Sequence, residues 1–236
     1  TTLQRLTKMK AILIFFFTCS AIVTQAVTTL SGSIEINKIN LTQLTVTYTF
    51  ILDQHDSVFS ADSFTSTIRC VGSSSNINLS NAVELSKTKH FSGCSKTNYK
   101  WNIVYGNTLD LRDTKFSAIG ACCNLKIDAS CGKRSNTISS LSTSLSDFYI
   151  YTQFENCNII SNQTPAYYSP LHRNNCLNQP YYFNQGTLDT ANFDSISYRL
   201  VAPLSTTGST LTFKSGYYAD QPLMPFYPAG RSYPYN

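Results

Sequence analysis

Charged side chains are scarce in this sequence, because Asp, Glu, Lys and Arg together make up 13% of its 236 residues. Disordered tails, coiled coils and long surface helices need many more charges, so this scarcity excludes those classes. Glycine and proline, with 10 and 8 residues, stay near ordinary usage, which excludes collagen-like and low-complexity chains. Tyrosine and phenylalanine are abundant at 15 and 14 residues, and such rings suit the pleated surface of a β-sheet. The composition predicts an all-β globular protein.

The first 26 residues have the pattern of a secretory signal peptide. Lys8 and Lys10 flank Met9 ahead of an apolar run over 11–17, and small residues lead on to Ala26. That run is too short to span a bilayer, and no later run is long enough, so we expect no transmembrane segment. Cleavage after Ala26 is expected to give a secreted or outer-surface protein. Lipidation at Cys19 is the alternative.

Removal of this leader changes the charge of the chain. The formal net charge of +5 includes Arg5, Lys8 and Lys10, so the mature chain keeps 15 basic and 13 acidic side chains, a net charge of +2. A charge this small gives no electrostatic footprint for nucleic acid. We therefore expect no nucleic-acid partner.

Seven cysteines remain after the leader is removed. In an exported chain they predict a disulfide framework, because no Cys-x-x-Cys or His-x-x-His spacing indicates a zinc site. Three bridges at most can form, and we expect Cys157–Cys176 to be one of them. Adjacent cysteines on a strand point to opposite faces, so Cys122 and Cys123 are expected to have separate partners, with a vicinal disulfide as the alternative. The candidates are Cys70, Cys94, Cys122, Cys123, Cys131, Cys157 and Cys176.

Short alternating segments predict the strands of a β-sandwich. Residues 44–50 alternate strictly between apolar side chains and threonine, residues 34–36 alternate likewise, and 37–42 between them predicts a hairpin turn. No segment keeps a helical period, and we expect 135–146 to be a polar strand or loop. Further expected strands lie at 64–71, 99–105, 148–154, 195–201 and 210–214.

A domain boundary is expected near 158–170, where Pro165 and Pro170 interrupt regular structure. It separates a first β-sandwich domain over 27–158 from a second over 159–236. The second has room for only three or four strands, and prolines keep its final segment out of a central strand. We therefore expect an incomplete second domain and further domains after it in a longer parent protein.

One motif lies at the start of that second domain. Residues 176–184 read Cys-Leu-Asn-Gln-Pro-Tyr-Tyr-Phe-Asn, followed by Thr-Leu-Asp at 187–189 and Asp-Ser-Ile-Ser-Tyr-Arg-Leu at 194–200. This resembles the C-x-N-Q-P-F-x-F-N … A-T-D-x-D-G-D-S-L-x-Y-x-L pattern of large secreted surface proteins in gliding Bacteroidetes. Upstream, Cys122-Cys123-Asn124 resembles the family's R-C-C-R-N, with Ala121 in place of the first Arg and the second Arg missing.

The resemblance implies a fold, a secretion route and a role. Proteins of this family carry tandem Ig-like or PKD-like β-sandwich domains and end in a gliding-motility-associated domain for type IX secretion. They are thought to act in adhesion and surface organisation, with no catalytic residues recognised in this module.

Histidine is scarce too, at His55, His90 and His172. A hydrolytic triad needs a histidine that a carboxylate orients toward a nucleophile, whereas neighbours such as His-Asp-Ser at 55–57 point to opposite faces of a strand. No Gly-x-Ser-x-Gly motif occurs in the sequence. We expect a non-enzymatic protein.

Two kinds of binding site remain as candidates. Asp189, Asn192 and Asp194 are closely spaced oxygen ligands that suit calcium, although bonds to their own turn backbone are the favoured alternative. No other cofactor is expected. Tyrosine pairs at 167–168, 181–182 and 217–218 offer rings on which sugars stack. The expected function is a non-enzymatic cell-surface module of an adhesin or gliding-associated protein that binds an extracellular glycan or protein. The alternative is a secreted carbohydrate-binding module, or the accessory domain of a glycan-active enzyme.

Overall fold

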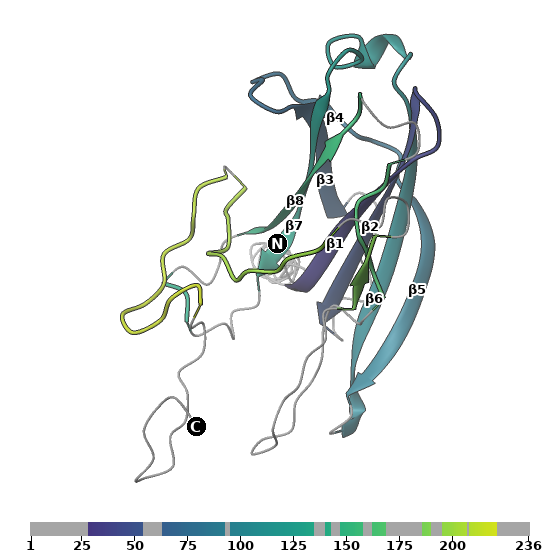
Figure 1. Ribbon diagram of the computed structural model, residues 1–236. Coiled ribbons are helices and arrows are strands. Elements are labelled where there is room, and N and C mark those ends of the chain that lie inside the picture. Colours follow the sequence, from purple (N-terminus) through teal and green to yellow (C-terminus); the bar gives the residue numbers. More distant parts are fainter. Residues whose placement is uncertain are drawn as a thin grey trace, which may run out of the picture.

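The computed structural model confirms the all-β class (Figure 1). It describes residues 28–53, 63–92, 95–134, 140–142, 147–157, 162–168, 186–189, 195–206 and 208–220. Across these residues, no helix is long and apolar enough to cross a membrane. The elements are β1 (Thr28–Lys38), β2 (Gln43–Asp53), β3 (Phe64–Cys70), β4 (Ile77–Asn78), β5 (Val83–Ser92), β6 (Ser95–Asp110), the 3-10 helix η2 (Thr114–Phe116), β7 (Asn124–Arg134), β8 (Asp147–Glu155), β9 (Ala166–Tyr167) and β10 (Thr187–Leu188).

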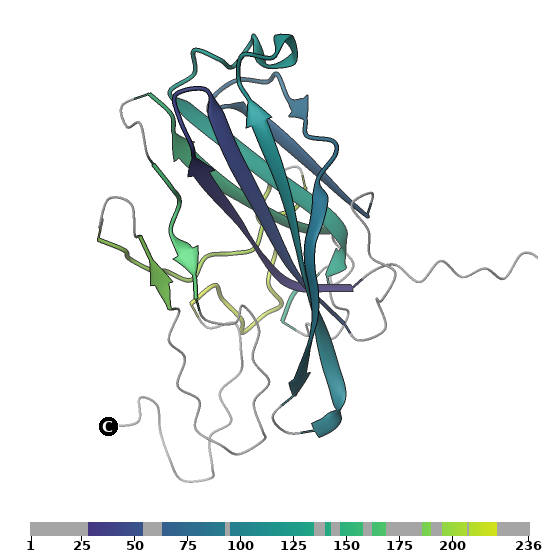
Figure 2. The ribbon, with the colours of Figure 1, turned by 90° about the vertical axis from the view of Figure 1, so that its right-hand side faces the viewer.

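Eight strands make one continuous ladder that folds into two layers. The strand order is β4-β3-β7-β1-β2-β6-β5, and β8 pairs with the edge of β7 opposite β3. The β1–β7 link is parallel and joins only Thr28 to Lys133 and Thr29 to Arg134, whereas the other pairings are antiparallel. The layers β1-β2-β6-β5 and β4-β3-β7-β8 therefore meet at one corner and otherwise face each other, as Figures 1 and 2 show. This arrangement is a β-sandwich.

The first hairpin confirms the alternation of the sequence. Leu44, Val46, Tyr48 and Phe50 of β2 are buried, while the threonines between them are partly exposed. The turn before β2 is held by the side-chain oxygen of Asn40, which accepts hydrogen bonds from the backbone N–H groups of Thr42 and Gln43, both at 2.9 Å. Asparagine favours such turns because its side chain bonds the nearby backbone.

Aromatic rings join the two layers. The ring centroid of Phe64, in β3, lies 5.2 Å from that of Tyr48, 5.0 Å from that of Phe50 and 5.3 Å from that of Tyr105. The Tyr48 hydroxyl lies 2.8 Å from the Ser66 hydroxyl, which donates to the Asp128 carbonyl. Because Ser66 has one proton to give, Tyr48 donates to Ser66. Both polar groups are therefore satisfied inside an apolar core.

Several expected strands differ from the observed ones. The segments 64–71, 99–105 and 148–154 are confirmed as parts of β3, β6 and β8, whereas β5 and β7 were not expected. The segments 195–201 and 210–214 form no strand, and the predictions there were wrong. Within the described part of the chain, the segment 210–214 makes isolated bridges, at Leu204–Thr210 and Leu141–Phe213. This segment does have neighbours, because the Leu211 N–H donates to the Pro203 carbonyl and the Lys214 N–H to the Ser140 carbonyl, but these bonds are too few for a strand ladder.

Residues beyond the expected domain boundary lie along the edge of β1. The backbone N–H of Lys38 donates to the Asn162 carbonyl, and that of Thr164 donates to the Ile36 carbonyl, both at 2.8 Å. Farther on, the backbone N–H of Tyr167 donates to the Glu35 carboxylate at 3.1 Å. The division into 27–158 and 159–236 stays a prediction, with these bonds crossing it.

Replacement of Phe64 by alanine is expected to lower the free energy of unfolding by about 3–5 kcal/mol, since it removes the ring that three facing side chains contact and leaves a cavity. Thr65→Ala, at the neighbouring exposed position, serves as the control and should cost well under 1 kcal/mol. Chemical denaturation of both variants tests this, and equal losses would refute the role given to Phe64.

Alkaline pH is expected to destabilise the fold. Burial raises the pKa of Tyr48 and of Tyr105 to about 12, from the usual 10. Because the unfolded chain ionises first, the stability present below pH 10 is lost as the pH rises from 10 to 12. Tyr105→Phe should reduce this loss. Absorbance titration should show a late tyrosine phase near pH 12, and a single phase at pH 10 would contradict the assignment.

Candidate functional site

One face of the β5–β6 hairpin carries a continuous row of aromatic and lysine side chains. On β6, Tyr99 and Trp101 lie on the same face as buried Ile103, because residues two apart share a face. The antiparallel register places Phe91 opposite Tyr99, Lys89 opposite Trp101 and Lys87 opposite Ile103. We call Lys87, Lys89, Phe91, Tyr99 and Trp101 the aromatic–lysine row.

The side chains of the row contact one another in sequence. Tyr99 and Trp101 pack edge to face, with centroids 5.6 Å apart and planes at 89°, and Phe91 lies 6.1 Å from Tyr99. The Lys89 ammonium is 4.6 Å from the Tyr99 centroid and 4.9 Å from that of Trp101, while Lys87 is 5.1 Å from Trp101. Cation–π contacts at these distances stabilise by roughly 0.5–1 kcal/mol each at exposed sites.

The row lies on the core-facing side of the β5–β6 hairpin, beyond the part that is buried. Ile103 is fully buried, Trp101 is half-buried against the core, and Phe91 at the outer end is 62% exposed. The hairpin extends past the end of β2, as Figure 2 shows. The facing layer therefore covers the inner part of this face and leaves the outer part open.

Two polar features mark the row. Lys89 makes no ion pair among the residues that the structure describes, so a positive charge stands over the rings without a carboxylate beside it. The indole Nε1 of Trp101 is buried, and no acceptor for its hydrogen lies among the described residues. A buried donor without an acceptor is costly, and such groups call for a physical explanation.

A second aromatic–lysine contact lies on the outer face of the other layer. The Lys126 ammonium is 4.1 Å from the Tyr151 centroid and 5.8 Å from that of Tyr149. Here a carboxylate is present, because Asp128 accepts hydrogen bonds from Tyr149 at 3.3 Å and from Thr67 at 2.8 Å. Burial raises the pKa of Tyr149 to about 12. This network satisfies its own charges, and we interpret it as structural.

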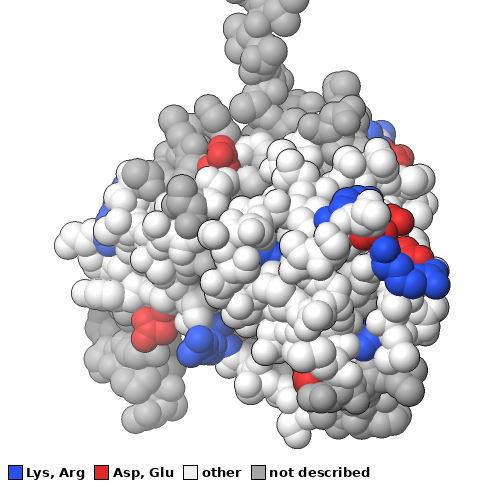
Figure 3. Space-filling view, turned by 90° about the horizontal axis from the view of Figure 1, so that it is seen from above, with Lys and Arg blue, Asp and Glu red and all other residues white. Residues whose placement is uncertain are grey.

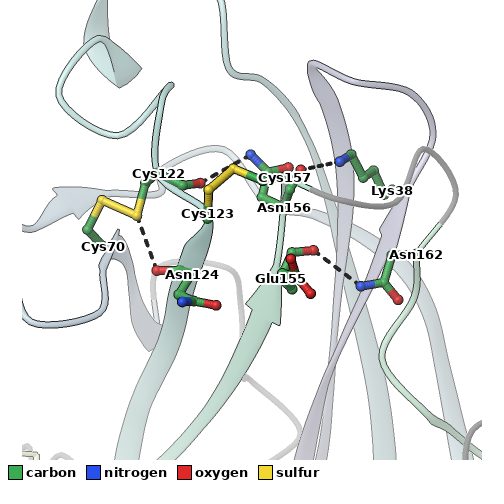
Figure 4. The surroundings of a disulfide bond; sticks show 9 residues. All are labelled: Lys38, Cys70, Cys122, Cys123, Asn124, Glu155, Asn156, Cys157 and Asn162. Atoms are coloured by element: carbon green, nitrogen blue, oxygen red, sulfur yellow. Dashed lines mark hydrogen bonds between the residues drawn. A yellow bond between two sulfur atoms is a disulfide. The ribbon is translucent and has the colours of Figure 1, made fainter.

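The two disulfides lie close together, near the start of β7 and the end of β8 (Figure 4). Cys70 bonds Cys122, and Cys123 bonds Cys157. The adjacent cysteines have separate partners, as expected, so the vicinal alternative is wrong. The expected Cys157–Cys176 bridge is also wrong, because the strand ends bring Cys157 to Cys123 instead.

The other cysteines fall into two groups. Cys131 is a buried free thiol that shares a hydrogen bond with the Thr29 hydroxyl at 3.3 Å, and burial raises its pKa to about 12. A thiol that stays protonated in the core is unreactive. Cys94 and Cys176 lie outside the described residues.

A buried lysine lies at one end of the sandwich, beside the Cys123–Cys157 bridge. Lys38 is 2% exposed, and its ammonium donates to the Asn156 carbonyl. The backbone N–H of Asn156 donates to the Cys123 carbonyl at 2.6 Å, and the Asn162 side chain donates to the Glu155 carbonyl at 3.2 Å (Figure 4). Burial lowers the pKa of Lys38, and the Glu155 carboxylate opposes this shift. These bonds tie the ends of β1 and β8 together.

Seen from above, this end of the molecule has few charged side chains: blue and red atoms adjoin in one group at the right, and others lie singly (Figure 3). Arg112 and Asp110 form such a pair, with 2.6 Å between their nitrogen and oxygen atoms. Among the described residues that Figure 3 shows, charged side chains form no patch of a single sign.

The calcium candidates are only partly placed. Asp189 lines a hollow of about 330 Å³ together with Glu155, Asn162 and serines at 195 and 197, whereas Asn192 and Asp194 lie outside the described residues. Within the described part of the chain, no three His, Cys, Asp or Glu side chains come together as a metal site would require. The calcium site stays a prediction.

The other sequence candidates are scattered. Tyr168 and Tyr218 are 65% and 61% exposed, in separate segments, and the pair at 181–182 lies outside the described residues. His90 is exposed on β5, while His55 and His172 also lie outside them. The row was not expected from the sequence, although the alternation Lys-x-Lys-x-Phe at 87–91 and Tyr-x-Trp at 99–101 marks it.

The sequence matches no protein-family model, no curated protein and no solved structure. The resemblance to surface proteins of gliding Bacteroidetes therefore stays a prediction.

Peptide mapping without reductant should recover Cys123 linked to Cys157. Replacement of both by serine is expected to lower the free energy of unfolding by about 3–4 kcal/mol, because the bridge closes a loop across a sequence separation of 34 residues. Cys131→Ser, which breaks no bridge, is the control for thiol chemistry. Recovery of Cys157 linked to Cys176 would overturn this connectivity.

Proposed function

We propose that this protein is a non-enzymatic extracellular module of a cell-surface adhesin, and that it binds its ligand through the aromatic–lysine row. The observation that carries the proposal is the row itself: three rings and two lysines on one open face, beyond the cover of the core. Aromatic side chains and cations at such a place are typical of recognition surfaces, since rings supply large contact area at low entropic cost.

The disulfides and the leader of the chain support an extracellular location. Two disulfides suit an oxidising compartment, and the leader over 1–26 has the pattern of a secretory signal. The resemblance to gliding-associated surface proteins would place the module on the outer surface of a bacterium that uses type IX secretion. Adhesion needs a binding face on a stable scaffold and no catalytic group, which is what the proposal assigns here.

The second candidate is a carbohydrate-binding module, on its own or as the accessory domain of a glycan-active enzyme. It is favoured by the rings of the row, because sugar rings stack on aromatic faces. Both candidates use the same surface. They differ in the protein to which the module belongs and agree on how it binds.

An array of neutral glycans, acidic glycans and immobilised matrix proteins tests the binding role. We expect the mature protein to bind at least one class, and Phe91→Ala combined with Tyr99→Ala to weaken that binding by roughly tenfold or more, as loss of anchor residues does. Tyr151→Ala, which removes an exposed ring from the other layer, should leave it unchanged. Equal binding by both variants, or no binding to any probe, would contradict the proposal.

A further inference from the structure

The geometry of the row points to an acidic polysaccharide, one whose sugar rings carry carboxylates, as the ligand of the β5–β6 hairpin. This inference rests on the proposed binding function and names the ligand class. It requires that rings and positive charges of the protein meet sugar rings and negative charges of the ligand in one place.

The rings define where sugars stack. Tyr99 and Trp101 are successive same-face residues of β6, and Phe91 lies beside them on β5. Same-face neighbours on a strand are about 7 Å apart, so Tyr99 and Trp101 are two successive rings along β6, and Phe91 widens this surface across the hairpin, opposite Tyr99. A polymer of pyranose units follows such a line of rings, whereas a globular protein partner needs a broader surface.

The lysines define the charge of the ligand. Lys87 and Lys89 lie on the same face of β5 and hold their ammonium groups over Trp101 and Tyr99. Lys89 has no ion-pair partner among the described residues, in contrast to the outer face of the other layer, where Asp128 accompanies Lys126 and Arg69. A carboxylate brought by the ligand would complete the row by charge complementarity.

The indole of Trp101 adds a third element. Its buried Nε1–H has no acceptor among the described residues, and the two lysines lie over the same ring. When carboxylates draw the ammonium groups off the ring face, a sugar ring can stack there, and a ligand oxygen at the edge of the indole accepts the Nε1–H hydrogen bond. The ligand thus replaces cation–π contacts by ion pairs and ring stacking.

Trp101 is the single tryptophan of the sequence, so emission excited at the long-wavelength edge, where tyrosine does not absorb, reports on the row alone. The probe is oligogalacturonate, and its fully methyl-esterified form is the matched neutral ligand with the same sugar backbone. We expect a saturable change in emission with the acid, and binding roughly tenfold or more weaker with the ester, because charge-assisted hydrogen bonds are lost. Binding of the acid should also weaken as salt is added.

Variants test the residues. Lys87→Gln combined with Lys89→Gln should weaken binding of the acid by roughly tenfold or more. Lys115→Gln combined with Lys126→Gln is the control, because it removes the same charge and three cation–π contacts elsewhere, and it should bind as the parent does. Lys89→Arg keeps the cation and should retain binding, so a loss seen only in the glutamine variant reports charge and not misfolding.

Each of the other outcomes would refute a specific part of the proposal. Equal binding of acid and ester, or full binding by the Lys87/Lys89 variant, would refute an acidic ligand while leaving the array result for the proposed function intact. Emission changes with phosphatidylserine vesicles but not with oligogalacturonate would identify a membrane surface instead and refute the polysaccharide. No change with any of the three probes would also refute it.

Discussion

The ring of Phe64, the first residue of β3, packs against Tyr48, Phe50 and Tyr105 of the facing layer. The rest of the sandwich is arranged around that contact. Among the described strands, backbone pairing joins the two layers only at the corner between β1 and β7, so side-chain packing and side-chain hydrogen bonds have to hold them face to face. Burial of large rings supplies that force, since each contributes a large apolar area. The Tyr48–Ser66–Asp128 bonds fix the rings in one register.

This packing also determines what is left uncovered. β6 is 16 residues long, whereas β3 in the facing layer has seven, so β3 cannot cover the inner face of β6 along its whole length. Ile103 and Tyr105 lie under the cover and are buried, while Tyr99 and Trp101 lie toward the open end. The proposed binding surface is thus the core face of β6 continued into solvent, with lysines of β5 taking the place that the second layer holds farther in.

Sequence alone predicts the parts of this molecule that alternate cleanly. Residues 44–50 have one apolar face and one threonine face, and they form β2. β5 could not be predicted in this way because it is an exposed edge strand, whose Lys, Thr and His side chains leave no continuous apolar face. Its place is set by pairing with β6, which is a tertiary effect. The partner of Cys157 likewise depends on where β8 ends relative to β7, and cysteine spacing does not carry that information.

The row is hidden from sequence reading for a related reason. Lys89 and Trp101 lie 12 positions apart in the chain and meet only through the register of the hairpin. The measurement that tests its role most directly is a two-dimensional NMR titration of the ¹⁵N-labelled protein with the ligand that it binds. The account predicts that the one indole cross-peak, from Trp101, shifts together with amides of β5 and β6. Shifts confined to the outer face of β3, β7 and β8, or to the hollow around Asp189, would contradict it.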